Sequence, residues 1–329
     1  WLILFLMIIA SLVEIVTVGA VIPFISILSA PEVVFNHQLA QPLIKVFEFN
    51  EAKQLILPIT IIFIIAAVVA GIVRLVLLYG MTRLSFATGA DISVNIYRRT
   101  LYQDYSAHLN KNSSEVINGI IVKSSTVISG VLVPMLVLIS STLLLIGIMG
   151  ALFFINAQVA LIASISFGTL YWAVIYFTRS QLNENSQLIA DQSTLMIKSL
   201  QEGLGGVRDV IIDGSQEFYT QLYRTADFTL RRASGNNSFI ANSPRFVMEA
   251  IGMVLISGLA FVMTRQDGGM SAALPVLGAL ALGAQRMLPA LQQAYSSYSI
   301  LKGSKSSFRD VLKMLEQTLP EHANQKQNE

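Results

Sequence analysis

The chain has 329 residues, of which 53% are hydrophobic and only 13% are charged, and its mean hydropathy is +0.62. A soluble domain is normally about a quarter charged, so this composition excludes an ordinary soluble protein. It also excludes a disordered chain, which needs low hydrophobicity and high charge. The net charge of +2 gives no concentrated basic face for nucleic acid, and cysteine is absent, so disulfides and thiolate chemistry are excluded too. The composition indicates an integral membrane protein.

Long apolar segments recur along the chain, and each is long enough to cross a bilayer, which takes roughly 20 helical residues. No charge occurs over the 55 positions from Ser124 to Thr178, which is enough for two spans with a tight turn at Asn156 to Gln158. We predict six spans in all, at about residues 1–28, 55–81, 124–155, 157–179, 246–264 and 270–295.

The basic residues alternate between the two sides of these spans. Residues 82–123, 179–245 and 286–329 together hold 18 of the 22 Lys and Arg residues. The side that is rich in Lys and Arg is cytoplasmic by the positive-inside rule. The sequence therefore predicts that both termini are cytoplasmic.

The two long cytoplasmic connections are the most informative part of the chain. They take up roughly residues 82–123 and 179–245, which is too long for structureless loops in a compact protein. Apolar residues recur in them at three- and four-residue spacing, so we expect the spans to continue as helices well beyond the bilayer, with a break at Gly214. The alternative is two cytoplasmic helical hairpins of unknown purpose.

Six spans with long cytoplasmic extensions after the second and fourth resemble the transmembrane domain of ATP-binding-cassette (ABC) exporters. The stretch Gly206-Val-Arg-Asp-Val-Ile-Ile-Asp-Gly-Ser-Gln-Glu-Phe218 resembles the second coupling-helix region of that family. Shorter pieces resemble the PglK-type branch of lipid-linked oligosaccharide flippases; they are Glu14 with Val21–Ile25, Asn112–Glu115, Asn237-Ser238, Pro244-Arg245, Glu249 and Arg286–Pro289. The resemblance implies an all-α, six-span domain that works as a homodimer in a bacterial inner membrane.

The resemblance also implies a nucleotide-binding domain, which would bind ATP and Mg. This chain has no Gly-x-x-x-x-Gly-Lys-Ser/Thr phosphate loop, and Gly303-Ser-Lys-Ser306 lacks the glycine before lysine. We expect residues 1–319 to form the transmembrane domain and residues 320–329 to be a linker toward a nucleotide-binding domain, fused or separate. No catalytic site and no metal site is expected in this chain, because its histidines, His37, His108 and His322, lie in different polar segments.

Three arginines, Arg74, Arg245 and Arg286, lie in or at the edge of predicted spans. An arginine at the bilayer centre costs roughly 2.5–3.5 kcal/mol on insertion scales, so each needs an aqueous cavity or a partner. A guanidinium group can donate two parallel hydrogen bonds to the oxygens of one phosphate. The resemblance implies that these arginines contact the pyrophosphate of a polyprenyl-linked glycan. The alternatives are that Arg245 pairs with Glu249 one turn later and that Arg74 extends to the interface.

Two other features of the spans have alternative interpretations. Glu14 is the only charge in the first span; it is either a proton or cation site or the partner of an arginine on a neighbouring helix. The external segment from Gln38 to Phe49 is consistent with an amphipathic interfacial helix. The resemblance implies that its residues Leu43 and Phe47 contact the lipid tail, whereas the alternative is a helix that only covers the span ends.

The resemblance implies that the turning points of the two cytoplasmic extensions dock into nucleotide-binding domains and transmit ATP-driven closure to the spans. The residues concerned are Tyr105, His108, Lys111, Asp213, Gln216 and Phe218. The alternative is that both turning points are simply solvated tips.

The expected function is ATP-driven flipping of a polyprenyl-pyrophosphate-linked oligosaccharide. The alternative within the same architecture is export of a peptide or a hydrophobic small molecule. From a different class, the chain would be a channel or a membrane scaffold. A channel predicts polar stripes on several spans, which the third and fourth spans lack, and a scaffold gives no reason for arginines in the fifth and sixth.

Overall fold

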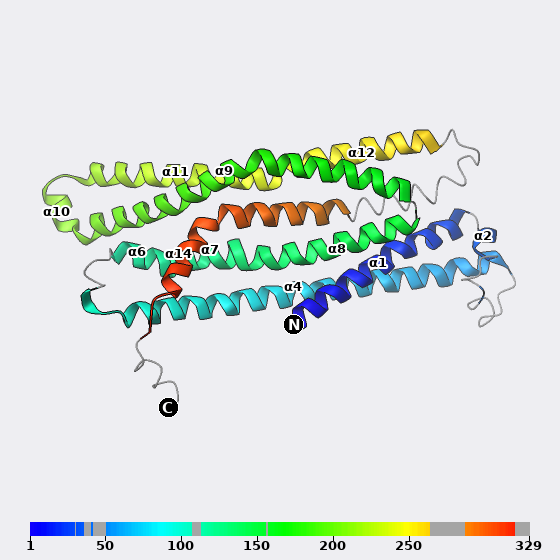
Figure 1. Ribbon diagram of the computed structural model, residues 1–329, viewed down its shortest axis with the longest axis horizontal. Helices are drawn as coiled ribbons and strands as arrows, with labels where there is room; N and C mark the ends of the chain where they lie inside the picture. Colours follow the sequence, from blue (N-terminus) through cyan, green and yellow to red (C-terminus); the bar gives the residue numbers. More distant parts are fainter. Residues whose placement is uncertain are drawn as a thin grey trace, which may run out of the picture. The chain divides into compact units, whose positions relative to one another are not determined.

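The computed structural model describes residues 1–29, 31–35, 41, 51–106, 113–155, 157–263 and 287–319 (Figure 1). Every regular element in these ranges is helical, which confirms the predicted all-α membrane fold. The elements are α1 Leu2–Ser29, α2 Pro31–Phe35, η1 Ala52–Leu55, α4 Ile56–Leu101, α6 Ser113–Asn118, η2 Gly119–Lys123, α7 Ser124–Val127, η3 Ile128–Leu132, α8 Val133–Ile155, α9 Ala157–Gly205, α10 Val207–Ile212, α11 Gln216–Asn242, α12 Pro244–Met263 and α14 Lys305–Leu315. Residues 287–303 are also helical. The segments η2 and η3 are π-helical.

Helix length supports the predicted cytoplasmic extensions. Three helical stretches in the described ranges, Leu2–Leu28, Ala52–Leu101 and Ser113–Ala151, are long and apolar enough to cross a membrane. The 46 residues of α4 extend about 70 Å at 1.5 Å per residue, more than twice the thickness of a bilayer core. The 49 residues of α9 likewise exceed what a span requires. The predicted turn at Asn156 and most of the predicted span 270–295 lie outside the described residues.

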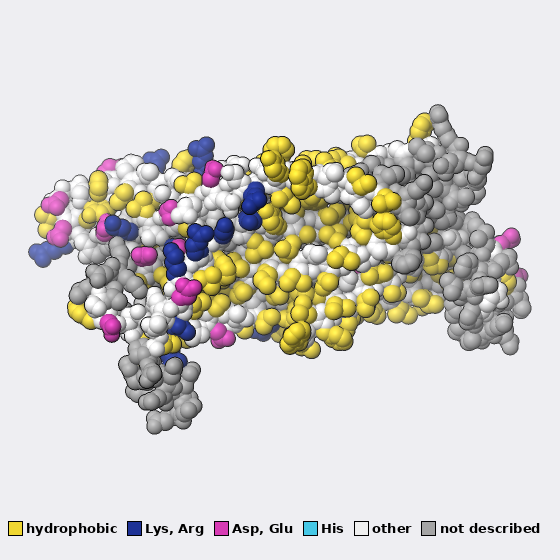
Figure 2. All heavy atoms as spheres, viewed as in Figure 1, with side chains coloured by type: hydrophobic (Ala, Val, Ile, Leu, Met, Phe, Trp, Pro, Cys, Tyr) yellow, Lys and Arg dark blue, Asp and Glu magenta, His cyan; other side chains and the backbone are white. Residues whose placement is uncertain are grey.

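The chain divides into two compact units. The first comprises residues 1–80, 138–173 and 243–294, and the second comprises residues 81–137, 174–242 and 295–329. The sequence of the first unit contains only six of the 22 basic residues, namely Lys45, Lys53, Arg74, Arg245, Arg265 and Arg286. On the face seen in Figure 2, hydrophobic side chains cover the described part of the first unit, and Lys, Arg, Asp and Glu gather over helices of the second. The first unit therefore has the composition of a membrane-embedded body, and the second that of a solvated one.

Close packing between small and apolar side chains holds the first unit together. A Cβ atom on Gly147 of α8 would lie 2.5 Å from Cδ1 of Ile15 on α1, so the glycine allows these helices to approach closely. Nearby, Ser11 Oγ donates a hydrogen bond of 3.1 Å to the carbonyl oxygen of Leu143. On another face of α1, the rings of Phe24 and Phe63 stack with their centroids 4.6 Å apart. These contacts connect α1 to both α8 and α4.

The second unit has a small apolar core surrounded by hydrogen-bonded polar groups. Ile96, Val127, Val131 and Val311 are buried together, and they come from α4, α7, η3 and α14. Between α9 and α11, Asn185 Nδ2 donates a 2.8 Å hydrogen bond to an asparagine side-chain oxygen on α11. The helices of this unit are therefore joined by specific polar contacts as well as by apolar packing.

Candidate functional site

A buried acid lies half-way along α1 in the first unit. Glu14 is 1% exposed, and its carboxylate forms an ion pair with the guanidinium of Arg74 on α4, whose side chain is 43% exposed. An unpaired carboxylate in an apolar environment is strongly unfavourable. The ion pair therefore neutralises Glu14 and holds Arg74 beside α1.

A second ion pair lies at the start of α12. The helix begins at Pro244. Proline suits the first position of a helix because a backbone N–H there would have no hydrogen-bond partner within the helix. Arg245 Nε donates a 2.7 Å hydrogen bond to Glu249 Oε1, one turn later on the same face. Both side chains stay accessible, 53% and 40% exposed. In water, an exposed i,i+4 pair of this kind contributes only about 0.3–0.5 kcal/mol, so Glu249 would hold Arg245 weakly wherever the start of α12 is hydrated.

The structure therefore gives each of the two described arginines its own acidic partner rather than joining both in one cluster: Arg74 pairs with Glu14, and Arg245 with Glu249. Several other predicted site residues lie outside the described residues: Arg286, Leu43, Phe47, His108 and Lys111.

The tip of the second long helical extension, which is predicted to be cytoplasmic, is a helical turn. α9 ends at Gly205, the short α10 follows, and the chain reverses at Asp213-Gly214 before α11 begins at Gln216. Gly214 has φ +66°, a left-handed conformation that glycine adopts without steric cost, so the predicted break is present there. The turn is closed by a 3.0 Å hydrogen bond from the Ser215 N–H to the Val210 carbonyl.

Large apolar side chains cover the outside of this tip. Leu204 and Ile212 are each 70% exposed, Phe218 is 65% exposed and Ile211 61%. Asp213 and Gln216, also predicted to act here, are exposed beside them. Exposed apolar clusters of this kind are typical of surfaces that contact a protein or a membrane. At the first tip, Tyr105 lies just beyond α4 and is 77% exposed.

The polar helix α11 contains an i,i+4 ion pair with a similar hydrogen-bond length to the pair on α12, in the opposite sequence order. Arg231 Nε donates a 2.8 Å hydrogen bond to Asp227 Oδ2, four residues earlier. The hydrogen bond and the charge of Asp227 raise the pKa of Arg231 above its ordinary value. Because α11 belongs to the solvated second unit, this pair is a useful comparison for Arg245 and Glu249.

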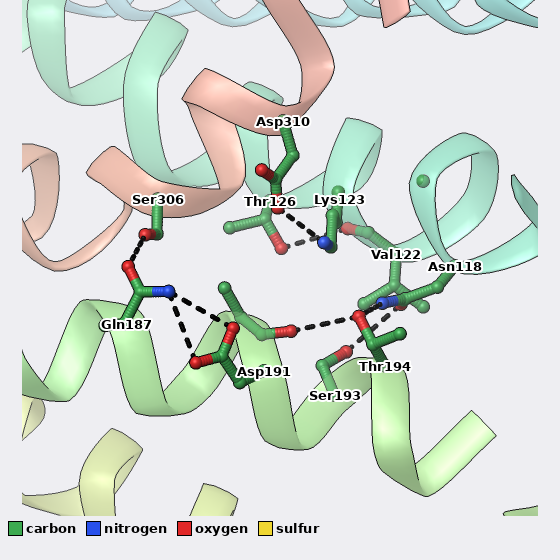
Figure 3. A network of polar contacts seen from close by, with 12 residues as sticks. Asn118, Val122, Lys123, Thr126, Gln187, Asp191, Ser193, Thr194, Ser306 and Asp310 are labelled. Carbon is green, nitrogen blue, oxygen red and sulfur yellow. Dashed lines mark hydrogen bonds and ion pairs between the residues drawn. The ribbon is translucent and has the colours of Figure 1, made fainter. Parts of the chain in front are cut away.

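Sequence reasoning missed a buried polar centre in the second unit (Figure 3). Lys123 Nζ lies 2.5 Å from Asp310 Oδ2 on α14, and the lysine side chain is only 8% exposed. Asn118, fully buried, donates a 2.9 Å hydrogen bond to Thr194 Oγ1 and accepts one of 3.1 Å from Ser193 Oγ. In the sequence, Lys123 merely precedes the long charge-free run, and nothing local points to its partner 187 residues away.

No group of three or more His, Asp or Glu residues that could hold a metal ion occurs among the residues that the structure describes.

The family of the chain follows from residues 2–272, which match the family model of the ABC transporter transmembrane region. The chain belongs to this family. In a comparison with curated proteins, no significant match was found. As an ABC transporter transmembrane region, the chain is the transmembrane half of an ABC transporter and a multi-pass membrane protein; such domains pair with nucleotide-binding domains and act as dimers. Membership favours a transporter over the channel and the membrane scaffold considered from the sequence.

Proposed function

We propose that this ABC transporter domain flips a polyprenyl-pyrophosphate-linked oligosaccharide outward across a bacterial inner membrane, as a homodimer driven by ATP. The observation that carries the proposal is Arg245, a half-exposed and weakly held guanidinium at the start of a helix predicted to span the bilayer. The partners are a second copy of the chain and nucleotide-binding domains, which bind the ATP and Mg.

An exposed guanidinium on a spanning helix requires a polar environment. An arginine that faces lipid costs up to roughly 2.5–3.5 kcal/mol, the insertion-scale value at the bilayer centre, and less toward the end of a span, where Arg245 lies. Arg74 and Arg245 keep 43% and 53% of their side-chain surface exposed. In a dimer with a water-filled path, this exposed surface would face the path or the second copy, and both positions avoid the cost of facing lipid.

A pyrophosphate fits Arg245 better than a neutral peptide does. The ion pair with Glu249 is worth only about 0.3–0.5 kcal/mol, so exchanging the carboxylate for a phosphate costs little. Charge-assisted hydrogen bonds to phosphate are stronger than neutral ones and can be bidentate with arginine. Arg245 is therefore the proposed first contact for the pyrophosphate.

Arg74 and Arg286 are proposed as further contacts. Arg74 cannot leave Glu14 without stranding a buried charge, so it would bind phosphate through the donors that Glu14 does not use. The lipid tail would contact the external segment at Leu43 and Phe47.

The tips would connect this path to ATP hydrolysis. The apolar residues around Ile212 and Phe218 have the exposure and size of residues that anchor protein interfaces. We propose that they dock on a nucleotide-binding domain together with Asp213 and Gln216, and that Tyr105, His108 and Lys111 do so at the first tip.

The proposal predicts that Arg245→Ala will raise the KM of transport for the lipid-linked glycan. The measurement uses liposomes that contain the chain assembled with its ATPase partner and a fluorescent polyprenyl-pyrophosphate glycan. The KM for this glycan should rise about tenfold, which corresponds to the lower end of the free-energy range for losing one hydrogen bond to a charged group. ATP hydrolysis without substrate should stay unchanged, because Arg245 is not part of the nucleotide site.

Arg231→Ala is the control, since it removes an i,i+4 arginine–carboxylate ion pair with a similar hydrogen-bond length, in the opposite sequence order, from the second unit. It should leave the KM for the glycan at the wild-type value. Equal effects of the two substitutions, or a wild-type KM in Arg245→Ala, would contradict a phosphate contact at Arg245. Export of a peptide or small molecule would then be favoured.

A further inference from the structure

The helix α14 contacts both helices of the first long extension: the outgoing helix α4, and the returning helix, which runs through α6, η2, α7, η3 and α8 from Ser113 to Ile155. Its buried face includes Val311, which packs with Ile96 of α4 and Val127 of α7. Just beyond its end, the carbonyl oxygen of Gln317 accepts a 2.6 Å hydrogen bond from Arg99 Nη1 of α4. α14 therefore contacts both arms of the helical hairpin.

Two glycines bring α14 and the returning helix unusually close together. A Cβ atom on Gly119 would lie 2.4 Å from the sulfur of Met314, and one on Gly130 would lie 2.8 Å from Cβ of Ser304. Both distances are too short for real Cβ contacts, so a side chain at Gly130 would displace Ser304, and one at Gly119 would require the flexible end of Met314 to move. The two contacts lie on either side of Lys123 in the sequence, and they place α14 in one defined register on the helix.

The Lys123–Asp310 ion pair lies within this contact (Figure 3). Lys123 is almost completely buried, whereas Asp310 keeps about a third of its side-chain surface exposed. A buried ammonium needs a partner because its desolvation is costly. Asp310 therefore fixes the position of Lys123, and the pair ties α14 to the returning helix by charge in addition to packing.

The returning helix has an unusual backbone at the same place. The π-helical segments η2 and η3 flank α7, and Lys123 is the last residue of η2. π-Helical turns are rare and occur frequently at functional sites. If η2 relaxed to an α-helix, the helix beyond it would shift by one residue, about 1.5 Å along and 100° around its axis. α7 and α8 both follow η2 in the chain, so α8 would then turn with α7.

From these observations we propose that Lys123 and Asp310 are positioning residues for transport: they lock α14 to the junction of η2 and α7, so that a movement of α14 in the ATP cycle turns α8. The inference uses only membership of the ABC transporter transmembrane region family and holds for any transported substrate.

The test uses a spin label and does not require the substrate. Since the chain has no cysteine, Thr142→Cys on the exposed side of α8 gives a single site for a nitroxide. In the transporter assembled with its ATPase partner, ATP with vanadate should change the nitroxide spectrum. In Lys123→Met and in Asp310→Asn, this spectral change should be largely lost, because α14 is no longer tied to the returning helix by charge, while ATP hydrolysis continues at the wild-type rate.

Lys123→Arg keeps the charge and should restore the spectral change. Lys198→Met is the matched control, because it breaks an ion pair within α9 alone, with Glu202, and should leave the spectral change intact. A wild-type spectral change in both Lys123→Met and Asp310→Asn would overturn the proposal. So would an equal loss of ATP hydrolysis and spectral response, because that result would assign the pair a role in folding alone. Neither outcome depends on the proposed glycan substrate.

Discussion

Replacing both Ile212 and Phe218 with aspartate will stop ATP-dependent transport while leaving the domain folded. Both side chains are largely exposed at the second tip, at 70% and 65%, so their loss removes no core packing. If they anchor a nucleotide-binding domain, each substitution removes a contact worth about 2 kcal/mol or more and buries a charge in the interface. The measurement is binding of the purified ATPase partner to the chain in nanodiscs, together with ATP-driven transport.

Phe228→Asp is the matched control for this prediction. Phe228 lies on the same helix, α11, and is 66% exposed, but it is ten residues beyond Phe218. The control should bind the ATPase partner normally. If the double substitution at the tip binds the partner as tightly as the wild type, the tip is a solvated surface and the proposed docking site is wrong.

Arg74→Leu will destabilise the domain more than Glu14→Leu. Removing Arg74 leaves the carboxylate of Glu14 buried at 1% exposure without its ion-pair partner, and breaking a buried pair in this way costs about 3–5 kcal/mol. Removing Glu14 instead leaves a guanidinium that is 43% exposed and can reach water or a partner. The measurement is the midpoint of thermal unfolding in one detergent for both single variants.

The double variant Glu14→Leu with Arg74→Leu completes the cycle. It should recover most of the stability lost in Arg74→Leu, because a buried ion pair can often be replaced by apolar residues at little cost. Two outcomes would show that the ion pair does not control the stability of this site. One is an equal drop in the unfolding midpoint of the two single variants, and the other is a drop in the double variant that equals the sum of the two single drops.

The all-α fold was predictable because its causes are local. The charge-free run from Ser124 to Thr178 and the helical spacing of apolar residues follow directly from the sequence. The reversal at Gly214 was predictable for the same reason, since glycine adopts φ +66° without strain.

The side-chain pairs were only partly predictable. Arg245 and Glu249 are four residues apart on one helix, and the pairing that this spacing allows is present in the structure. Pairing of Glu14 with an arginine was one of two readings of the sequence, and the sequence did not say which arginine. That choice depends on how α1 packs against α4.

The contact between Lys123 and Asp310 could not be predicted at all. It depends on where α14 packs, and that packing is set by glycines whose neighbours are distant in sequence. The π-helical segments were equally hidden, because their hydrogen-bond pattern has no clear sequence signature. Roles for the arginines and the tips in transport remain predictions.

The most direct test of the central proposal is ATP-dependent movement of a polyprenyl-pyrophosphate glycan by the wild-type transporter. Proteoliposomes would contain the chain with its ATPase partner and a fluorescent lipid-linked glycan, and a glycosidase outside would report the glycan in the outer leaflet. With the nucleotide-binding domains facing outward, the proposal predicts that external ATP lowers the fraction of glycan open to the glycosidase, because transport carries it into the vesicle. Steady ATP hydrolysis with an unchanged accessible fraction would contradict the proposal and leave an ABC transporter for a different substrate.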